Sequence, residues 1–273
     1  MNWREWPAAA EPMTAGMMQV GATLVERRVV GAVQELRLQQ PRLAARLTAG
    51  QPVLVRTGWG MVPYLRRPFY PIAITADSWV VRLPADGDPG HAWLRTVPEG
   101  TELDCLGPIG LGFRLPDGTR RVLCLGEGEA AWSLLPLVVE ADALAMAVTL
   151  AVAAITRREA IPAARLPPAV EYRLIPRDES HGPEQLEDTW GELLPWADVV
   201  MAAGSVPFYR RLVEAIRVHR LLLRPGFAQV LYPTTFLCGT GACLACVADV
   251  AGGRRRVCRR GPVFDLTEVV ETG

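Results

Sequence analysis

The chain has 273 residues, which is long enough for two or three small domains. Its 29 basic and 29 acidic side chains balance to a formal net charge of zero, so the whole molecule lacks the field that draws a protein to nucleic acid or to an anionic membrane. The longest apolar run, 143–155, is shorter than the roughly 20 residues that a membrane-spanning helix needs. We therefore expect a globular protein with several domains, no nucleic-acid partner and no membrane span.

Residues 1–16 are predicted to be an N-terminal extension, either disordered or used for docking. Their sequence, MNWREWPAAAEPMTAG, lacks the apolar core of a signal peptide. The Met17-Met18 pair that follows leaves open whether these sixteen residues are present in the mature chain.

Residues 17–116 are predicted to form an antiparallel β-barrel or sandwich. Short apolar or alternating stretches follow one another at close spacing and are separated by turn residues such as Gly and Pro, which is typical of such folds. One short helix is expected at 41–47 (PRLAARL). The expected strands lie at 22–30, 32–39, 51–56, 71–75, 79–83 and 102–106.

Residues 119–225 show a different pattern, in which continuous apolar runs alternate with helix-length segments. This alternation is typical of a parallel sheet covered by helices on both faces. Loops are expected at 162–168 and 176–183. The expected strands lie at 121–126, 145–155, 170–176 and 197–204, and the expected helices at 129–144 and 208–219.

Residues 226–273 carry four cysteines in the spacing C-x4-C-x2-C-x11-C, with a hairpin turn expected at 251–253. These cysteines are Cys238, Cys243, Cys246 and Cys258. The plant-type [2Fe–2S] spacing is of this kind, and Gly239 and Gly241 let the backbone wrap closely around a cluster. A structural zinc site and four unrelated thiols are the alternatives. Because zinc sites favour two short, well-separated cysteine pairs, we predict a [2Fe–2S] cluster.

The other two cysteines, Cys105 and Cys124, lie in apolar, strand-like runs and are expected to be buried small hydrophobes. Thiolate ligands together with reduced thiols indicate a reducing compartment, so a cytoplasmic location is expected.

Three motifs together resemble the electron-transfer subunit of class 1B dihydroorotate dehydrogenase, a branch of the ferredoxin reductase superfamily. The block at 238–269, CGTGACLACVADVAGGRRRVCRRGPVFDLTEV, resembles the family's cysteine block and its Arg-Val-Cys…Gly-Pro-Val-Phe run. The segment LDCLGPIGLGF at 103–113 is similar to Leu-Asp-x-x-Gly-Pro-Leu-Gly-x-Gly-Phe, and LRRPF at 65–69 resembles the opening of the flavin-binding Arg-Pro-x-Ser motif. The motifs span most of the chain, although only the cysteine block is specific by itself.

The resemblance implies an FAD-binding barrel, an NAD-binding-type α/β domain and a small [2Fe–2S] domain, in that order. It also implies a hetero-oligomer with an FMN-containing catalytic subunit that oxidises dihydroorotate to orotate in pyrimidine biosynthesis. We therefore expect an electron-transfer subunit that is an oxidoreductase component only within its complex. Two alternatives stay open: a subunit of another flavoenzyme or hydrogenase, or a non-enzymatic [2Fe–2S] protein that has lost its dinucleotide sites.

For FAD, the resemblance implies a pyrophosphate contact from Arg67, because a guanidinium makes planar, bidentate contacts with phosphate. This chain departs from the family at Tyr70, where a small hydroxyl residue is usual, and at His91, where the phosphate-binding turn has threonine. The predicted flavin residues are Arg67, Pro68, Phe69, Tyr70, Gly90, His91, Gly107, Gly110 and Gly112.

For NAD, the family's glycine-rich loop corresponds here to 126–133, which contains Glu127, Glu129 and Trp132. Carboxylates near a pyrophosphate repel it, and an indole fills space that alanine leaves open. The segments 177–180 and 203–205 depart from the family as well. We therefore expect an α/β domain that kept its fold and lost NAD.

Five arginines surround Cys258 in the sequence. Their charge is expected to raise the cluster's reduction potential and to form a docking face for an acidic partner, the alternative being a solvated hairpin without a special role. These residues are Arg254, Arg255, Arg256, Arg259 and Arg260.

Overall fold

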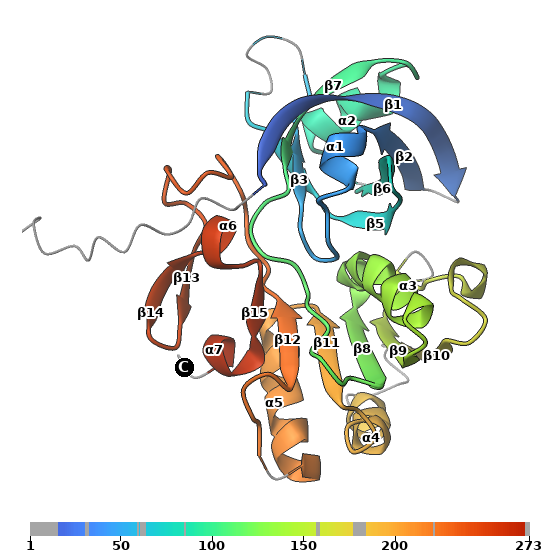
Figure 1. Cartoon of the computed structure of the whole chain (residues 1–273), viewed down its shortest axis with the longest axis vertical. Coiled ribbons are helices and arrows are strands. Elements are labelled where there is room, and N and C mark those ends of the chain that lie inside the picture. The colour runs from blue at the N-terminus through green and yellow to red at the C-terminus, as the bar shows by residue number, and fades with distance from the viewer. Residues whose placement is uncertain are drawn as a thin grey trace, which may run out of the picture.

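The computed structural model describes residues 16–30, 33–58, 60, 64–84, 86–156, 159–176, 184–220 and 222–270. The predicted N-terminal extension, apart from Gly16, and the predicted loop segment 177–183 lie outside these residues. Figure 1 shows an antiparallel sheet curled above a parallel sheet, with the C-terminal segment against the side of both. The predicted fold class is confirmed.

The N-terminal sheet has seven strands in the order β4-β3-β7-β1-β2-β6-β5, and all its pairs are antiparallel. Its two edge strands, β4 and β5, are separated in sequence only by Tyr70, so the edges of the sheet lie close together and the barrel is nearly closed. Alternate side chains such as Leu36, Leu38 and Trp79 fill its interior. The strands are β1 Met18–Val30, β2 Val33–Gln39, β3 Val53–Val55, β4 Arg67–Phe69, β5 Pro71–Ile74, β6 Ser78–Leu83 and β7 Glu102–Gly107.

Two short helices cover this barrel. The first, α1 (Pro41–Ala44), lies in the predicted helical segment. The second, α2 (Pro89–Thr96), was expected only as a turn. It forms because the Asp88 side chain accepts hydrogen bonds from the first free N–H groups and because Pro89 is favoured in the first helical turn.

The central sheet has six strands in the order β10-β9-β8-β11-β12-β15, all parallel except β15. Every residue of β11 is buried, as expected for a strand covered on both faces. The strands are β8 Arg121–Glu127, β9 Ala147–Ala154, β10 Glu171–Pro176, β11 Val199–Ala203, β12 Ala228–Leu231 and β15 Val263–Asp265. The helices are η2 Gly128–Leu134, α3 Leu135–Ala143, η3 Ala163–Arg165, α4 Glu184–Leu193 and α5 Val206–Arg220.

The helix predicted at 129–144 is divided. Its first part is the 3-10 segment η2, and only α3 is α-helical. Pro136 lies in the first turn of α3, where a missing N–H is tolerated, and it cannot continue an α-helical ladder from η2. The loop predicted at 162–168 contains the short 3-10 turn η3. Helix α4 was not predicted.

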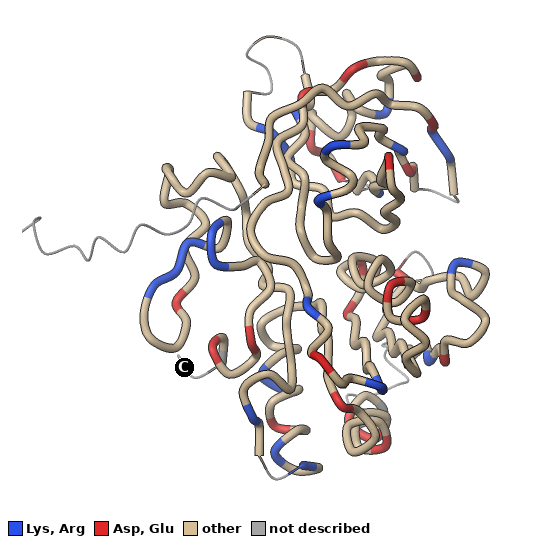
Figure 2. Tube along the Cα trace, viewed as in Figure 1, with Lys and Arg blue, Asp and Glu red and all other residues tan. Residues whose placement is uncertain are grey.

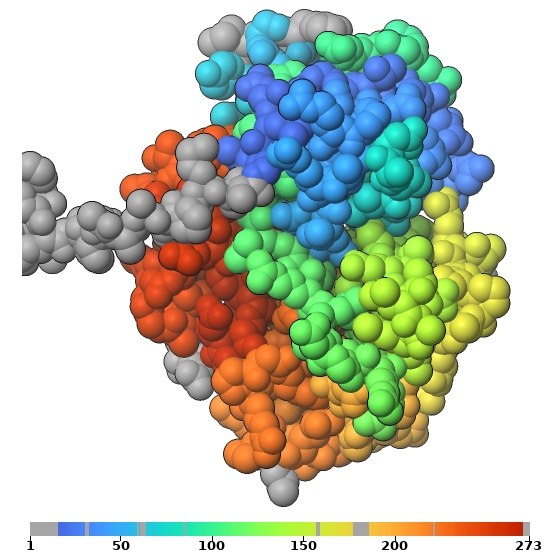
Figure 3. Space-filling model, viewed as in Figure 1, coloured from blue at the N-terminus to red at the C-terminus, as the bar shows by residue number. Residues whose placement is uncertain are grey.

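The C-terminal segment contributes to two sheets. Its strands β12 and β15 extend the central sheet, although both fall in the range predicted for the cluster domain. The predicted hairpin is present, because β13 (Val247–Val250) pairs with β14 (Gly253–Arg256). The short helices α6 (Val257–Arg260) and α7 (Leu266–Val270) complete the segment. Figure 3 shows it packed against both the barrel and the α/β domain.

Candidate functional site

Three of the predicted cluster cysteines lie in the loop 238–246, and Cys258 lies in α6. The thiols form two pairs, because Cys238 hydrogen-bonds Cys243 and Cys246 hydrogen-bonds Cys258. Within the described part of the chain, no three His, Cys, Asp or Glu side chains converge on a single-ion site. Two thiol pairs fit a [2Fe–2S] cluster, in which each of the two irons takes two thiolates.

Glycine is required at two positions of this cysteine loop. Gly239 and Gly241 have φ values of 71° and 82°, in the left-handed region that favours glycine. A Cβ atom on Gly239 would lie 2.7 Å from Leu54 Cδ1 of β3, and one on Gly241 would lie 2.9 Å from Arg259 Cγ. The loop therefore packs directly against the barrel, and its shape depends on these two residues.

Two of the four thiols, Cys238 and Cys246, have a lowered pKa. Partial burial opposes ionisation of Cys238, but hydrogen bonds from Thr240 and Cys243 outweigh it and lower its pKa to about 6. A hydrogen bond from Cys258 lowers the pKa of Cys246 to about 6, and the pKa of Cys258, as the donor in that pair, is raised. Because the thiolate is the metal-binding form of cysteine, this arrangement favours binding of iron.

One side of the cysteine loop is accessible from solvent. Cys243 is exposed, and the Leu244 side chain is 63% exposed. Arginines follow one another along β14 and α6 beside the loop, and their positions are blue on the backbone tube in Figure 2. Arg256 donates a 3.1 Å hydrogen bond to Gly241 O, so part of this charge is tied to the loop itself.

A cleft of about 630 Å³ lies between the central sheet and the part of the barrel where its edge strands β4 and β5 meet. Predicted flavin residues Pro68, Phe69 and Tyr70 line it on the barrel side, and the segment 231–234 lines the opposite side. Burial raises the pKa of Tyr70, so its hydroxyl remains a hydrogen-bond donor at neutral pH. The volume and the mainly apolar walls fit a flat aromatic ring system.

The predicted phosphate-binding residues also lie together, but a carboxylate of the chain lies among them. Arg67 Nε donates to Asp88 Oδ2 at 2.9 Å, and Asp88 Oδ1 accepts from the backbone N–H groups of Gly90 at 2.7 Å and His91 at 3.2 Å. Partial burial opposes ionisation of Asp88, yet hydrogen bonds from Arg67 and the two N–H groups lower its pKa. The anionic form of Asp88 therefore fills this place at neutral pH.

His91 is buried and its ring is held away from the helix N-terminus. Its Nδ1 lies 2.8 Å from Asp86 Oδ1, and the ring packs edge-on against Phe69 with centroids 5.4 Å apart. Gly90 has no room for a side chain, because a Cβ atom would lie 2.2 Å from Thr57 Oγ1.

The three remaining predicted glycines have a packing role in the structure. A Cβ on Gly110, whose φ is 69°, would lie 1.9 Å from Gly261 O, and one on Gly112 would lie 2.5 Å from Ala49 O. Gly107, at the end of β7, has Val53 as its neighbour. The chain thus crosses between the barrel and the C-terminal segment here, and these glycines are not among the residues that line the cleft.

The NAD-type edge of the central sheet is occupied by side chains of the protein. Dinucleotides bind parallel sheets at the carboxyl ends of the strands. Here Glu127 Oε2 accepts from Ser205 N at 2.9 Å, just before α5. Glu159 Oε2 accepts from Ile155 N at 2.7 Å, just after β9. Two N–H groups at this edge, those of Ser205 and Ile155, are therefore engaged by carboxylates. The predicted segment 177–180 lies outside the described residues.

A contact between domains closes the same region. The Trp132 indole is 4% exposed and donates a 3.1 Å hydrogen bond to Glu159 O. Arg82 of β6 lies over the indole ring, 3.5 Å from its centroid, and pairs with Glu129 at 3.3 Å. The barrel and η2 are thus joined across one end of the cleft.

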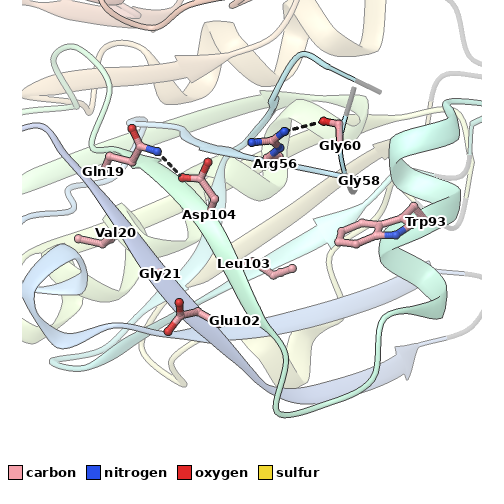
Figure 4. A pocket seen from close by; sticks show the side chains of 10 residues that line it. All are labelled: Gln19, Val20, Gly21, Arg56, Gly58, Gly60, Trp93, Glu102, Leu103 and Asp104. Atoms are coloured by element: carbon pink, nitrogen blue, oxygen red, sulfur yellow. Dashed lines mark hydrogen bonds between the residues drawn. The ribbon is translucent and has the colours of Figure 1, made fainter. Parts of the chain in front are cut away.

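A second hollow, of about 740 Å³, lies on the barrel between β1, β7 and α2 (Figure 4). Much of its polar lining is paired internally: Gln19 Nε2 lies 3.0 Å from Asp104 Oδ1, and Arg56 Nη2 lies 2.6 Å from Gly60 O. Trp93 projects from α2 at its edge in Figure 4. No residue of this hollow was predicted from sequence as functional.

The N-terminus of α2, with Arg67, and the carboxyl edge of the central sheet are called here the two nucleotide-type niches. Sequence reasoning missed four residues of these niches. Arg82 and Thr57 meet their neighbours only through tertiary packing, so no local pattern indicates them. Asp88 carried a usable signal, because Asp followed by Pro is a typical helix start. Glu159 follows the end of strand β9 by a few residues, where a carboxylate can accept from the backbone N–H groups after the strand. Nothing in the sequence identifies the Ile155 N–H as the group that it contacts.

None of the described helices is both long and apolar enough to cross a membrane.

Comparison with known proteins identifies a family for the cysteine segment and relatives for most of the chain. Residues 234–270 match the family model of the iron–sulfur cluster binding domain of dihydroorotate dehydrogenase B. The chain is 28% identical over 257 residues to the electron transfer subunit of dihydroorotate dehydrogenase B (NAD(+)) of Geobacillus thermodenitrificans, covering 91% of this chain and 97% of that one. The corresponding subunit of Caldanaerobacter subterraneus is 28% identical over 212 residues, 76% of this chain and 81% of that one.

Solved structures show the same fold at lower identity. The structure of an NADH-dependent reduced ferredoxin-NADP oxidoreductase aligns with a TM-score of 0.74 at 19% identity, covering 92% of this chain and 90% of that one. The ferredoxin reductase of carbazole 1,9a-dioxygenase aligns with a TM-score of 0.59 at 19% identity, over 75% and 65% of the two chains. The chain thus has a ferredoxin-reductase-like fold with an iron–sulfur cluster binding segment, and it resembles the electron-transfer subunits of dihydroorotate dehydrogenase B.

Proposed function

We propose that the protein is an electron-transfer subunit that carries electrons between FAD, a [2Fe–2S] cluster and a partner oxidoreductase. The observation that carries the proposal is that Cys238 lies beside Cys243, and Cys246 of the same loop lies beside Cys258 of α6, within the matched iron–sulfur segment. The loop packs on the barrel. A bound cluster supplies a one-electron carrier, and the four thiolates hold it with the backbone N–H of Thr240 directed at Cys238.

FAD is proposed on the barrel side of the cleft. Pro68, Phe69 and Tyr70 would hold its ring system, and Arg67 is the nearby cation for its phosphates. FAD supplies a carrier that exchanges either one or two electrons. The cysteine loop contacts the same barrel through Leu54 and Ile109, which supports the proposal that both cofactors are bound at the barrel.

NAD is not part of the proposal. Glu127 and Glu159 engage the backbone donors at the sheet edge, and the Arg82–Trp132 contact joins the two domains beside the cleft. A phosphate would have to displace carboxylates from these N–H groups. Electrons are therefore proposed to enter and leave through partners of the cluster and the flavin rather than through NADH bound to this chain.

The partner is proposed to be an FMN-containing subunit of the dihydroorotate dehydrogenase type, assembled with this chain in a cytoplasmic hetero-oligomer. The relatives are electron transfer subunits by name, which supports the need for a catalytic partner. The arginines beside the cysteine loop, with the exposed Leu244, favour an acidic partner surface. A subunit of another flavoenzyme or of a hydrogenase would use the same surface, and co-purification distinguishes these partners.

The docking surface can be tested by replacing Arg254, Arg255 and Arg260 with glutamine in the complex with the co-expressed partner subunit. Affinity is expected to fall and to lose most of its salt dependence, because long-range attraction by these charges is screened by salt. A control variant neutralises three exposed arginines elsewhere, at 210, 217 and 224. Equal affinity and salt dependence in both variants would refute docking at this face.

The proposed cofactors can be tested on the protein as purified. Absorption together with iron, sulfide and flavin analysis is expected to give about two irons per chain and a visible spectrum of a [2Fe–2S] flavoprotein. Cys246→Ser is expected to remove the iron, whereas Cys124→Ala, a change at a buried cysteine in β8, is expected to keep it. Iron retained in Cys246→Ser at the level of the unmodified protein would refute the assignment of the ligands.

A cluster protein without flavin, acting as a structural or redox-sensing component, is the second candidate. The Asp88 carboxylate at the predicted phosphate contacts favours it. Denaturing the protein and measuring released flavin by fluorescence distinguishes the two functions, because only the electron-transfer subunit proposed above releases FAD.

A further inference from the structure

The N-terminus of α2 has the features of an anion niche. Backbone N–H groups of Gly90 and His91 point out of the first turn, and the helix dipole adds partial positive charge there. The Arg67 guanidinium faces the same point from strand β4. Helix dipole, N–H donors and a fixed guanidinium together are the chemistry that recognises a phosphate group.

Asp88 fills this niche with a carboxylate of the chain itself. Its two oxygens take the Gly90 and His91 N–H groups and Arg67 Nε, at 2.7, 3.2 and 2.9 Å. A carboxylate carries the charge and the acceptor geometry of a phosphate oxygen pair, so it satisfies the same donors. A phosphate that entered the niche would find its hydrogen-bond donors already occupied, and the negative charge of Asp88 would repel it.

A second observation indicates that the niche is built for a larger ligand than Asp88. The Thr57 hydroxyl is fully buried, it lies where a side chain of Gly90 would be, and it has no hydrogen-bond partner among the described residues. Buried hydroxyls without a partner are rare, because losing a hydrogen bond to water is costly. Thr57 thus adds an unused donor directly beneath the helix N-terminus.

We propose that this niche is a phosphate subsite held closed by Asp88, and that the diphosphate of a flavin dinucleotide binds only when the Asp88 side chain moves out. Arg67, the Gly90 and His91 N–H groups and the Thr57 hydroxyl then serve the phosphate. The inference rests on the proposed flavin site, and it identifies Asp88 as the residue that sets the affinity for the dinucleotide. The affinity for ligands that carry the ring system without phosphates does not depend on Asp88.

The test uses the full-length, cluster-containing chain stripped of flavin. Affinities for FAD and riboflavin are measured by fluorescence, and binding of inorganic pyrophosphate by its effect on the melting temperature. Asp88→Asn and Asp88→Ser keep a residue that can cap α2 while removing the charge. Asp86→Asn is the matched control, because it removes a carboxylate two residues away that contacts His91 but none of the α2 N–H groups.

Asp88→Asn is expected to bind FAD at least about tenfold more tightly than the unmodified chain, with riboflavin changed less than about twofold. Thr57→Val in the Asp88→Asn background is expected to reverse part of the gain. FAD affinity that is unchanged or weaker in both Asp88 variants, or an equal gain in Asp86→Asn, would overturn the inference.

If no variant binds any flavin, the proposed FAD function fails, and the binding of pyrophosphate decides the inference. Stabilisation of Asp88→Asn alone supports it, and no stabilisation of either Asp88 variant overturns it.

Discussion

The cysteine loop and the two nucleotide-type niches use similar backbone features with opposite results. In the loop, the Thr240 N–H is directed at the Cys238 sulfur, and glycines at 239 and 241 hold the backbone in the curved form that this requires. In the niches, comparable N–H groups are already engaged by Asp88, Glu127 and Glu159. The loop therefore presents ligands to an incoming group, whereas each niche contains an internal anion.

This difference indicates how one fold can keep one cofactor site and close another. A carboxylate at a helix N-terminus or a strand end stabilises the domain by capping it. The same carboxylate repels a phosphate that approaches these N–H groups. In the cysteine loop, by contrast, the described contacts of Cys238 and Cys246 are hydrogen bonds with other thiols, with Thr240 and with the backbone, and none of them is with a carboxylate.

The largest effect is expected from Cys246→Ser, which removes a ligand from the buried thiol pair. Near-complete loss of bound iron is expected, because serine is a poor ligand for a cluster built on thiolates. Iron analysis and visible absorption measure it. Cys105→Ala, which changes a buried cysteine of β7 outside the loop, is the control and is expected to keep the iron. An equal loss of iron in both variants would contradict the assignment of Cys246 as a ligand.

A smaller effect is expected from Gly239→Ala. The new Cβ would meet Leu54 Cδ1 at 2.7 Å in a left-handed backbone conformation, and the combined strain is expected to cost about 1–3 kcal/mol of unfolding free energy. Gly118→Ala is the matched control, because Gly118 has a φ of 79° but nothing within 4 Å of its Cβ position. Equal losses in chemical denaturation would show that the contact with the barrel contributes nothing.

The closed NAD-type edge is tested by Arg82→Ala. Loss of the guanidinium over Trp132 and of the pair with Glu129 is expected to lower the unfolding free energy by about 1–2 kcal/mol. Arg82→Lys keeps the charge but loses the planar stack on Trp132. Its unfolding free energy is expected to lie between that of Arg82→Ala and that of the unmodified protein. A stability of Arg82→Ala equal to that of the unmodified protein would contradict a contact that joins the domains.

The smallest effect concerns Asp88 and pH. Its pKa is lowered in the folded protein from an ordinary value of 3.8, so the contribution of its charge is fully present above that value and is lost as pH falls through the folded pKa. Asp88→Asn is therefore expected to be less stable than the unmodified protein by about 0.5–1 kcal/mol at pH 7 and equally stable near pH 2. Denaturation at both pH values measures this; a difference that persists unchanged in acid would assign it to packing rather than to charge.

The sequence predicted most of the strands because their apolar patterns are local. Strand β11, for instance, is a run of five buried residues. It did not predict that β12, with only four residues, would join the parallel sheet, since that pairing depends on contact with β11 rather than on its own pattern. Helix η2 departed from the expected α-helix because of Pro136, whose effect on the preceding turn is visible only once the helix start is known.

The cluster ligands could be predicted because their chemistry depends on spacing along the chain. The absence of an NAD site stays a prediction, made from Glu127 and Trp132; the groups that these two residues contact could not be predicted. Thr57 and Arg82 were beyond sequence reasoning, because each contacts a partner that only folding brings close, whereas Asp88 before Pro89 carried a local helix-start signal. Arg82 and Trp132 are fifty positions apart, and nothing in either segment indicates the other.

One anaerobic titration tests the central contrast between an open cluster site and a closed NAD site. The protein as purified is treated with NADH, followed by dithionite, while flavin and cluster absorption are recorded. Dithionite is expected to bleach the cluster and any bound flavin, whereas NADH at micromolar concentration is expected to leave both unchanged. Rapid bleaching by micromolar NADH would contradict that expectation, because hydride transfer would require the dinucleotide to bind where Glu127, Glu159 and Trp132 now lie.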